Sequence, residues 1–98
     1  MYYAIYCEDN PTDNIVKRKS IRPAHLSRLT TLEEENRLLT AGPLFLQDGD
    51  NPNQSGIYGS LIIAKFDSLA DAKAWAAADP YVTAGIYNNI NIHPYKKI

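Results

Sequence analysis

The stretch Ile57-Tyr58-Gly59-Ser60-Leu61-Ile62-Ile63-Ala64-Lys65-Phe66 decides the fold. It is the strongest strand signal in the chain, and strict alternation puts apolar side chains on both of its faces. One face is predicted to carry Ile57, Leu61 and Ile63, and the other Tyr58, Ile62, Ala64 and Phe66. A strand covered on one side only should alternate between apolar and polar residues. We therefore expect helices to cover one face and the sheet of a second copy of this chain to cover the other.

Three more strands flank this stretch in the sequence. Residues 2–8 are rich in tyrosine and isoleucine, and residues 38–46 form a second strand signal. Pro43 cannot donate to a ladder, so that second strand is expected to be an edge strand or to be bulged there. Residues 86–95 alternate as the last strand, in which Tyr87 is predicted on the same side as Asn89, Asn91 and His93.

Apolar residues at helical spacing predict two helices. The first covers residues 15–37, with Ile21, His25, Leu29 and Leu32 on one stripe. Pro23 predicts a kink or a fresh helix start near residues 21–23. The second begins at Asp67-Ser68, and a short helical turn follows at Asp79-Pro80-Tyr81. The resulting order, β-α-β-β-α-β, predicts one domain over residues 1–98. Its fold class is α+β and ferredoxin-like, an antiparallel sheet with both helices on one face.

Composition excludes several classes of function. The 98 residues carry a formal net charge of −1 and no basic patch, so nucleic acid is not an expected partner. No apolar run is long enough to span a bilayer, and the first residues do not look like a signal peptide, so we expect a cytoplasmic protein without membrane contact. Cys7 is alone, and a buried structural thiol is favoured over a redox or nucleophilic one.

His25 is the most informative polar residue because it interrupts the apolar stripe of the first helix. It is either a core histidine bonded to a backbone carbonyl or a general acid or base with a partner carboxylate. Asp79 is the candidate partner, although an Asp-Pro pair is also a common helix start, with the aspartate as N-cap. If the two meet, Asp79 would fix the imidazole tautomer and leave the other nitrogen for substrate.

Other residues are weaker candidates for a binding site. Arg22 lies near the stripe of His25 and could hold a substrate carboxylate, or form a surface or intersubunit ion pair. Ser60 follows Gly59 in the central strand, where small residues leave room for a ligand or for helix packing. Gly42 and Pro43 could shape a pocket wall or merely end the pairing of an edge strand.

Metal and cofactor signals are missing from the sequence. His25 and His93 are far apart and lack an acidic pair at ligand spacing, so no metal site is expected. There is no phosphate loop and no dinucleotide-binding or nucleophile-elbow motif, and no cofactor is predicted.

Several short motifs, in order, resemble the YciI-like (YCII-related) family over the whole length. They are Lys17-Arg18, Arg22-Pro23-Ala24-His25-Leu26, residues 37–43, residues 56–60, Ala74-Trp75, Asp79-Pro80-Tyr81, Ala84-Gly85 and residues 94–97. The resemblance implies a dimeric α/β-barrel arrangement in which two sheets pack face to face. It also implies an active site on His25 and Asp79, with Tyr81 from the same motif beside the substrate.

Relatives in that family imply lyase or isomerase chemistry, since they include a dehydrochlorinase and muconolactone-isomerase-like enzymes. The leading hypothesis is therefore a His–Asp enzyme that moves a proton on a small anionic metabolite. The alternatives are a non-catalytic small-molecule binding or sensing protein, and a carrier with a phosphorylatable His25. The sequence names no substrate.

Overall fold

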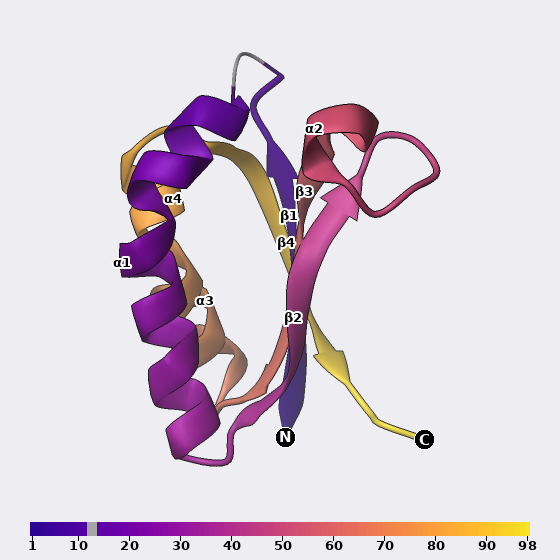
Figure 1. The fold of residues 1–98 in the computed structure, drawn as a ribbon. Helices are drawn as coiled ribbons and strands as arrows, with labels where there is room; N and C mark the ends of the chain where they lie inside the picture. Colours follow the sequence, from indigo (N-terminus) through magenta and orange to yellow (C-terminus); the bar gives the residue numbers. More distant parts are fainter. Residues whose placement is uncertain (12–13) are drawn as a thin grey trace.

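The computed structural model describes residues 1–11 and 14–98, and it has the predicted architecture. Four strands form one antiparallel sheet in the order β2-β3-β1-β4: β1 (Tyr2–Asp9), β2 (Leu38–Phe45), β3 (Ile57–Lys65) and β4 (Tyr87–Tyr95). Helices α1 (Asn14–Glu34), α3 (Leu69–Ala77) and α4 (Pro80–Thr83) all lie on one face of this sheet, as Figure 1 shows. The ferredoxin-like α+β fold is confirmed.

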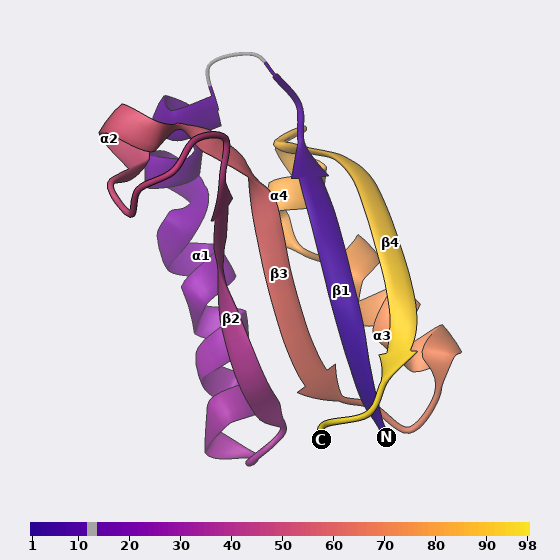
Figure 2. The ribbon, with the colours of Figure 1, turned by 90° about the vertical axis from the view of Figure 1, so that its right-hand side faces the viewer.

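The strand order explains the position of Pro43. β1 and β3 are central and β2 is an edge strand, as Pro43 predicted (Figure 2). The polar loop after β2 contains a single helical turn, α2 (Pro52–Ser55), which the sequence did not predict. Asn51 caps this turn by accepting a hydrogen bond from the amide of Asn53. In the described part of the chain, no helix is long and apolar enough to cross a membrane.

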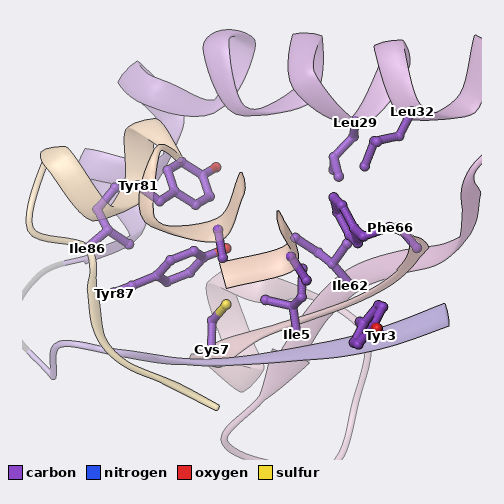
Figure 3. Packing of buried hydrophobic residues seen from close by; sticks show 13 residues of the cluster. Tyr3, Ile5, Cys7, Leu29, Leu32, Ile62, Phe66, Tyr81, Ile86 and Tyr87 are labelled. Atoms are coloured by element: carbon purple, nitrogen blue, oxygen red, sulfur yellow. The ribbon is translucent and has the colours of Figure 1, made fainter. Parts of the chain in front are cut away.

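The core lies between the sheet and the helices. Alternate residues of β1, namely Tyr3, Ile5 and Cys7, point toward the helices and are buried (Figure 3). Leu29 and Leu32 of α1 pack onto them from the predicted stripe. From α3, Ala72 and Ala76 complete the core, and both are buried. Full burial of a large apolar side chain such as that of Ile5 or Leu32 stabilises the fold by about 1.5–3 kcal/mol relative to exposure.

Residue Pro23 does not divide the first helix, contrary to prediction. α1 continues through it from Asn14 to Glu34. Pro23 is exposed, and so is Lys19, whose carbonyl loses its helical hydrogen bond to the missing N–H. Solvent can satisfy that carbonyl, so the proline costs less than it would on the buried side.

Three predicted side-chain directions, those of Ile57, Tyr58 and Tyr87, are wrong, and two β-bulges explain them. The pairing of β2 with β3 shifts between Leu44 and Phe45, which adds Tyr58 as an extra residue. Tyr58 therefore does not point toward the helices but packs beside Tyr6 and donates to the carboxylate of Glu8 on the other face.

The second bulge is in β4. The pairing of β1 with β4 shifts between Glu8 and Asp9, where Asn88 is the extra residue. Tyr87 consequently joins the core beside Cys7 and does not share the outer side with Asn89. Strict alternation is lost at a bulge because the two residues opposite one partner do not continue the pleat.

Gly59 has a backbone role that differs from both alternatives considered for the small residues here, room for a ligand and helix packing. A Cβ at this position would lie 1.8 Å from the carbonyl oxygen of Cys7. Glycine thus allows β3 to approach β1 where Gly59 is opposite Glu8 in the register. The neighbouring Ser60 pairs with Cys7 and is buried on the helix side of the sheet.

Candidate functional site

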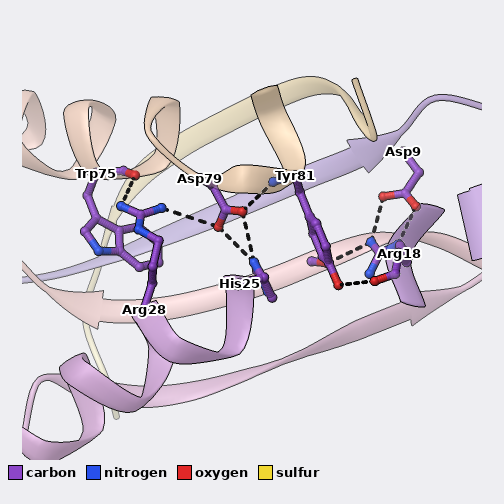
Figure 4. Close-up of polar contacts among 8 residues, drawn as sticks. Asp9, Arg18, His25, Arg28, Trp75, Asp79 and Tyr81 are labelled. Carbon is purple, nitrogen blue, oxygen red and sulfur yellow. Dashed lines mark hydrogen bonds and ion pairs between the residues drawn. The ribbon is translucent and has the colours of Figure 1, made fainter. Parts of the chain in front are cut away.

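The structure brings His25 and Asp79 together under the helices. The Nδ1 atom of His25 lies 3.0 Å from Oδ1 and 2.9 Å from Oδ2 of Asp79. Both residues are buried, with exposed fractions of 7% and 2%. Figure 4 shows the pair between α1 and the turn that starts α4. Fifty-four residues separate them in the chain, so the ferredoxin-like topology makes this contact.

Local structure holds Asp79 in place. Asp79 is the N-cap of α4, and its Oδ1 accepts a hydrogen bond from the amide of Tyr81 at 2.9 Å. Pro80 at the first helical position has no N–H to satisfy and has a pre-set φ. The two readings of Asp79 are therefore compatible, because one carboxylate both caps a helix and contacts the imidazole.

A second cation also faces Asp79. The Nη1 atom of Arg28, one turn along α1 from His25, lies 3.6 Å from Oδ2. The guanidinium stacks over Trp75 at 4.3 Å and donates to its carbonyl oxygen at 2.7 Å. Burial lowers the pKa of Arg28, and the charge of Asp79 partly opposes that shift. Arg28 was not recognised in the sequence, where an arginine on an α1 face gives no specific signal.

This arrangement fixes the hydrogen-bonding roles of the imidazole. A carboxylate can only accept, so Nδ1 of His25 carries the proton and donates to Asp79. In the neutral ring Nε2 is then the lone-pair nitrogen. Within residues 1–11 and 14–98, Nε2 makes no hydrogen bond with another side chain or with the backbone. The ring is thus ready to accept a proton on its free side.

Tyr81 lies between the imidazole and a buried arginine. Its ring stacks on His25 with 4.1 Å between centroids and an interplanar angle of 8°. The guanidinium carbon of Arg18 lies 4.9 Å from the centre of the same ring. Burial raises the pKa of the Tyr81 hydroxyl, while the charge of Arg18 counteracts part of the shift. A protonated His25 would be stabilised by the π face of Tyr81 as well as by Asp79.

The pair borders a cavity of about 450 Å³, which is within the usual range for small-molecule sites. The structure brings the predicted residues together there: His25, Arg22, Gly42, Pro43, Ser60 and Tyr81 all line it, and Asp79 lies behind His25. Ile15, Leu26, Leu29, Ala41, Ile57 and Ile62 supply apolar walls. Besides the phenol of Tyr81, the ionisable groups among the lining residues are His25 and three cations, Arg18, Lys19 and Arg22. An apolar cavity with basic groups suits a small anion.

Sequence reasoning missed Arg18 as part of the site. It is only 7% exposed, and Nε and Nη2 each donate to a carboxylate oxygen of Asp9 at 2.7 Å. Burial would lower the pKa of Arg18, but the hydrogen bonds to Asp9 and its charge outweigh that, so the pKa is raised. The spacing in the sequence could have identified Arg18, because residue 18 is seven positions before His25 and therefore lies on the same helical stripe.

Cys7 is not suited to nucleophilic chemistry. It is buried in β1, and burial, followed by the charge of Asp79, raises its thiol pKa to about 12. The thiol is therefore protonated near neutral pH, and a thiolate is the reactive form. His93 lies opposite Ala4 in the β4–β1 register, on the sheet face away from the helices.

Comparisons with known proteins agree over the full length. A family model described as the YCII-related domain matches residues 1–96. The protein named YciI from Escherichia coli O6:H1 is 51% identical over 98 residues, which cover 100% of this chain and 99% of that one. A protein of Haemophilus influenzae is 49% identical with the same coverage.

Among solved structures of similar fold is 5-chloro-2-hydroxyhydroquinone dehydrochlorinase from Burkholderia phenoliruptrix AC1100 in complex with 2,5-dihydroxybenzoquinone. The TM-score is 0.83, with 98% of this chain and 94% of that chain covered. Sequence identity is 24%, so the likeness concerns the fold.

Proposed function

We propose that this chain, which belongs to the family of YCII-related domain proteins, is an acid–base enzyme of lyase or isomerase type. His25 would move a proton on a small anionic metabolite, and Asp79 would orient and stabilise the imidazole. The observation that carries this proposal is a buried His25–Asp79 contact at the wall of a basic cavity. A core histidine of purely structural role has no need of a cavity on its free side.

The chemistry follows from the geometry. Nε2 of His25 accepts a proton from a carbon or hydroxyl of the bound molecule, and the imidazolium is stabilised by Asp79 and by the face of Tyr81. If the imidazolium returns this proton to another position of the substrate, the reaction is an isomerisation. If His25 keeps the proton while an anion leaves the substrate, the reaction is an elimination. Arg22 and Lys19 at the cavity would attract the anionic substrate. The dehydrochlorinase of similar fold supports elimination from an oxygenated ring as the first reaction to try.

The test is turnover by the wild-type protein. We expect 5-chloro-2-hydroxyhydroquinone, or a related oxygenated ring acid in a small panel, to be converted with release of chloride or with an isomeric product detected by mass spectrometry. Saturable binding of a panel member that is recovered unchanged would contradict the enzyme and favour a binding or sensing module. An acid-labile phosphate on His25 in protein isolated from cells would favour a phosphohistidine carrier instead.

We further propose that the chain forms a homodimer by packing the open sheet faces of two copies together. The face opposite the helices carries the half-buried side chains of Tyr2, Ala4 and Tyr6 of β1 and of Leu61 of β3, whereas Ile63 on the same face is already buried within one chain. No described helix or strand covers this face (Figure 1). Large contiguous apolar patches are rarely left exposed by soluble monomers.

Leu61→Glu is expected to convert this dimer into a monomer. Leu61 pairs with Tyr6 at the centre of the open face, and a carboxylate there would be buried without a partner in the dimer. Light scattering after gel filtration measures the mass. Val16→Glu is the matched control, because Val16 is 74% exposed on α1 and its charge should leave the mass unchanged. A wild-type monomer at micromolar concentration would disprove the dimer.

A further inference from the structure

We propose that Arg28 is a positioning residue of the site, which acts through Asp79 and weakens the hold of His25 on the proton that it accepts. This inference rests on the proposed function, because it concerns the proton that His25 would move. A buried imidazolium beside a carboxylate is strongly stabilised, and a base that keeps its proton cannot start a second turnover. A cation on the other side of the carboxylate weakens that stabilisation.

Contacts with α3 fix the side chain of Arg28. Its Nη2 atom donates to the carbonyl oxygen of Trp75 at 2.7 Å, and its guanidinium carbon lies 4.3 Å from the centre of the Trp75 ring. The amide of Asp79 donates to the carbonyl oxygen of Ala76, so the carbonyl oxygen of Trp75 has the guanidinium as its donor instead. A cation is also favourable at the carboxyl end of α3, which has no basic residue in its own last turn.

The other end of the same guanidinium faces Asp79. The Nη1 atom lies 3.6 Å from Oδ2 of Asp79, which is an ion-pair distance and too long for a hydrogen bond (Figure 4). Nη1 is buried and donates to no residue among those that the structure describes. A simple clamp between helices would bond both amino groups. Here one buried amino group is left facing the carboxylate, so Arg28 acts on Asp79 by its charge.

One carboxylate therefore faces an imidazole and a guanidinium. Oδ2 of Asp79 lies 2.9 Å from Nδ1 of His25, and it is the same oxygen that Arg28 approaches. While the ring is neutral, the charges of Arg28 and Asp79 balance. Once Nε2 accepts a proton, two positive charges share one negative charge, which disfavours the imidazolium and helps it to pass the proton on.

Partial exposure limits the size of this effect. The Arg28 side chain is 23% exposed and that of Asp79 is 3% exposed, so water screens part of the repulsion between guanidinium and imidazolium. Unit charges on either side of one carboxylate still interact appreciably at the effective dielectric constant of a protein. We expect removal of the Arg28 charge to raise the proton affinity of His25 about tenfold, which moves its titration by about one pH unit.

The other ionisable groups around His25 carry no comparable charge. They are Arg18 and Arg22 of α1, Tyr81 of α4, Tyr87 of β4 and Cys7 of β1. Burial raises the pKa of both phenols and of the thiol, so these three groups are uncharged near neutral pH. Asp9 compensates the charge of Arg18, and Arg22 is exposed to solvent that screens it. Among the described residues, His25 therefore titrates mainly against Asp79 and Arg28.

The pH at which the ring of His25 titrates measures the effect without any substrate. His25 and His93 are the two histidines of the chain, so NMR resolves both rings, and His93 on the far face of the sheet is the internal reference. Arg28→Gln removes the charge and keeps an amide donor for the carbonyl of Trp75. We expect His25 to titrate about one pH unit higher in Arg28→Gln than in the wild type, with His93 unchanged.

Three further variants separate charge from structure. Arg28→Lys keeps the charge, so the titration of His25 should stay close to that of the wild type. Arg22→Gln is the matched control, because Arg22 is also three residues from His25 on α1 but is exposed and makes no ion pair with Asp79. Its loss should move the titration much less. Ser27→Ala, an exposed change beside Arg28, should move neither the titration nor the melting temperature. A purely structural Arg28 would lower the melting temperature of its variants and leave the titration unchanged.

The wild type gives a second test, which applies even where a variant does not fold. The guanidinium signal of Arg28 in carbon or nitrogen NMR should change at the same pH as the ring of His25, since both groups share Asp79. An unchanged titration in folded Arg28→Gln, an equal shift in Arg22→Gln, or an Arg28 signal that does not follow His25 would each overturn the inference. None of these measurements involves a reaction, so they can succeed when turnover fails, and turnover can be found when they fail.

Discussion

Replacing His25 by alanine is expected to lower kcat at least a hundredfold on whichever substrate the wild type converts, within the range of about 10²–10⁴ typical of a general acid or base. The imidazole is the only group at the cavity that combines a free ring nitrogen with an oriented, buried carboxylate behind it, among the residues that the structure describes. Initial-rate kinetics on protein of verified fold and mass measure the effect.

Two conservative variants make the result specific. His25→Asn places an amide donor near Nδ1, so the contact with Asp79 can persist while the proton acceptor at Nε2 is lost. His25→Gln offers an amide near the position of Nε2 but cannot accept and return a proton. Both are expected to be as inactive as alanine. Activity within a few-fold of wild type in His25→Ala would show that the proton is moved by another group. Ser27→Ala should retain full activity.

The order of strands and helices was predictable because each element has a strong local pattern. The stripe of His25, Leu29 and Leu32 gave the inner face of α1, and Ser68 begins α3 as its N-cap, accepting from the amide of Asp71. The edge position of β2 followed from Pro43. Such features depend on residues within a few positions of one another, so a single sequence contains them.

The bulges and the arginines could not be predicted in the same way. Tyr58 and Tyr87 change face because of a register shift against a neighbouring strand, which is a property of the pairing and not of either strand alone. Asp9 at the end of β1 meets Arg18 of α1 although nine residues separate them in the chain. Asp79 meets Arg28 because α4, which Asp79 caps, packs against α1. Long-range contacts of this kind depend on the whole fold, and an arginine on a helix is usually solvated.

Replacing Asp79 should separate its two tasks, which are capping α4 and orienting His25. Asparagine is as good an N-cap as aspartate, so the hydrogen bond from the amide of Tyr81 can remain. Its side chain lacks the charge that stabilises an imidazolium, and its NH₂ group cannot accept from Nδ1. We expect Asp79→Asn to lower kcat by about 10²–10⁴, as in other triads that lose the orienting carboxylate, with a smaller loss of stability than alanine causes.

Asp79→Ala should lose both activity and stability. Removal of the cap costs about 1 kcal/mol, and a buried ion pair that loses one partner costs about 3–5 kcal/mol because Arg28 is left uncompensated. Since 1 kcal/mol changes the melting temperature of a domain of this size by about 4–8 °C, a decrease of more than about 10 °C should be visible by circular dichroism. Asp71→Asn, an exposed acidic residue of α3, is the control and should change neither quantity. If Asp79→Asn kept nearly wild-type kcat while Asp79→Ala unfolded, Asp79 would be a structural cap alone, and His25 would have to act without it. If the Asp79→Asn variant were instead stable but inactive, the Asp79 carboxylate would be needed for the reaction as well as for capping α4.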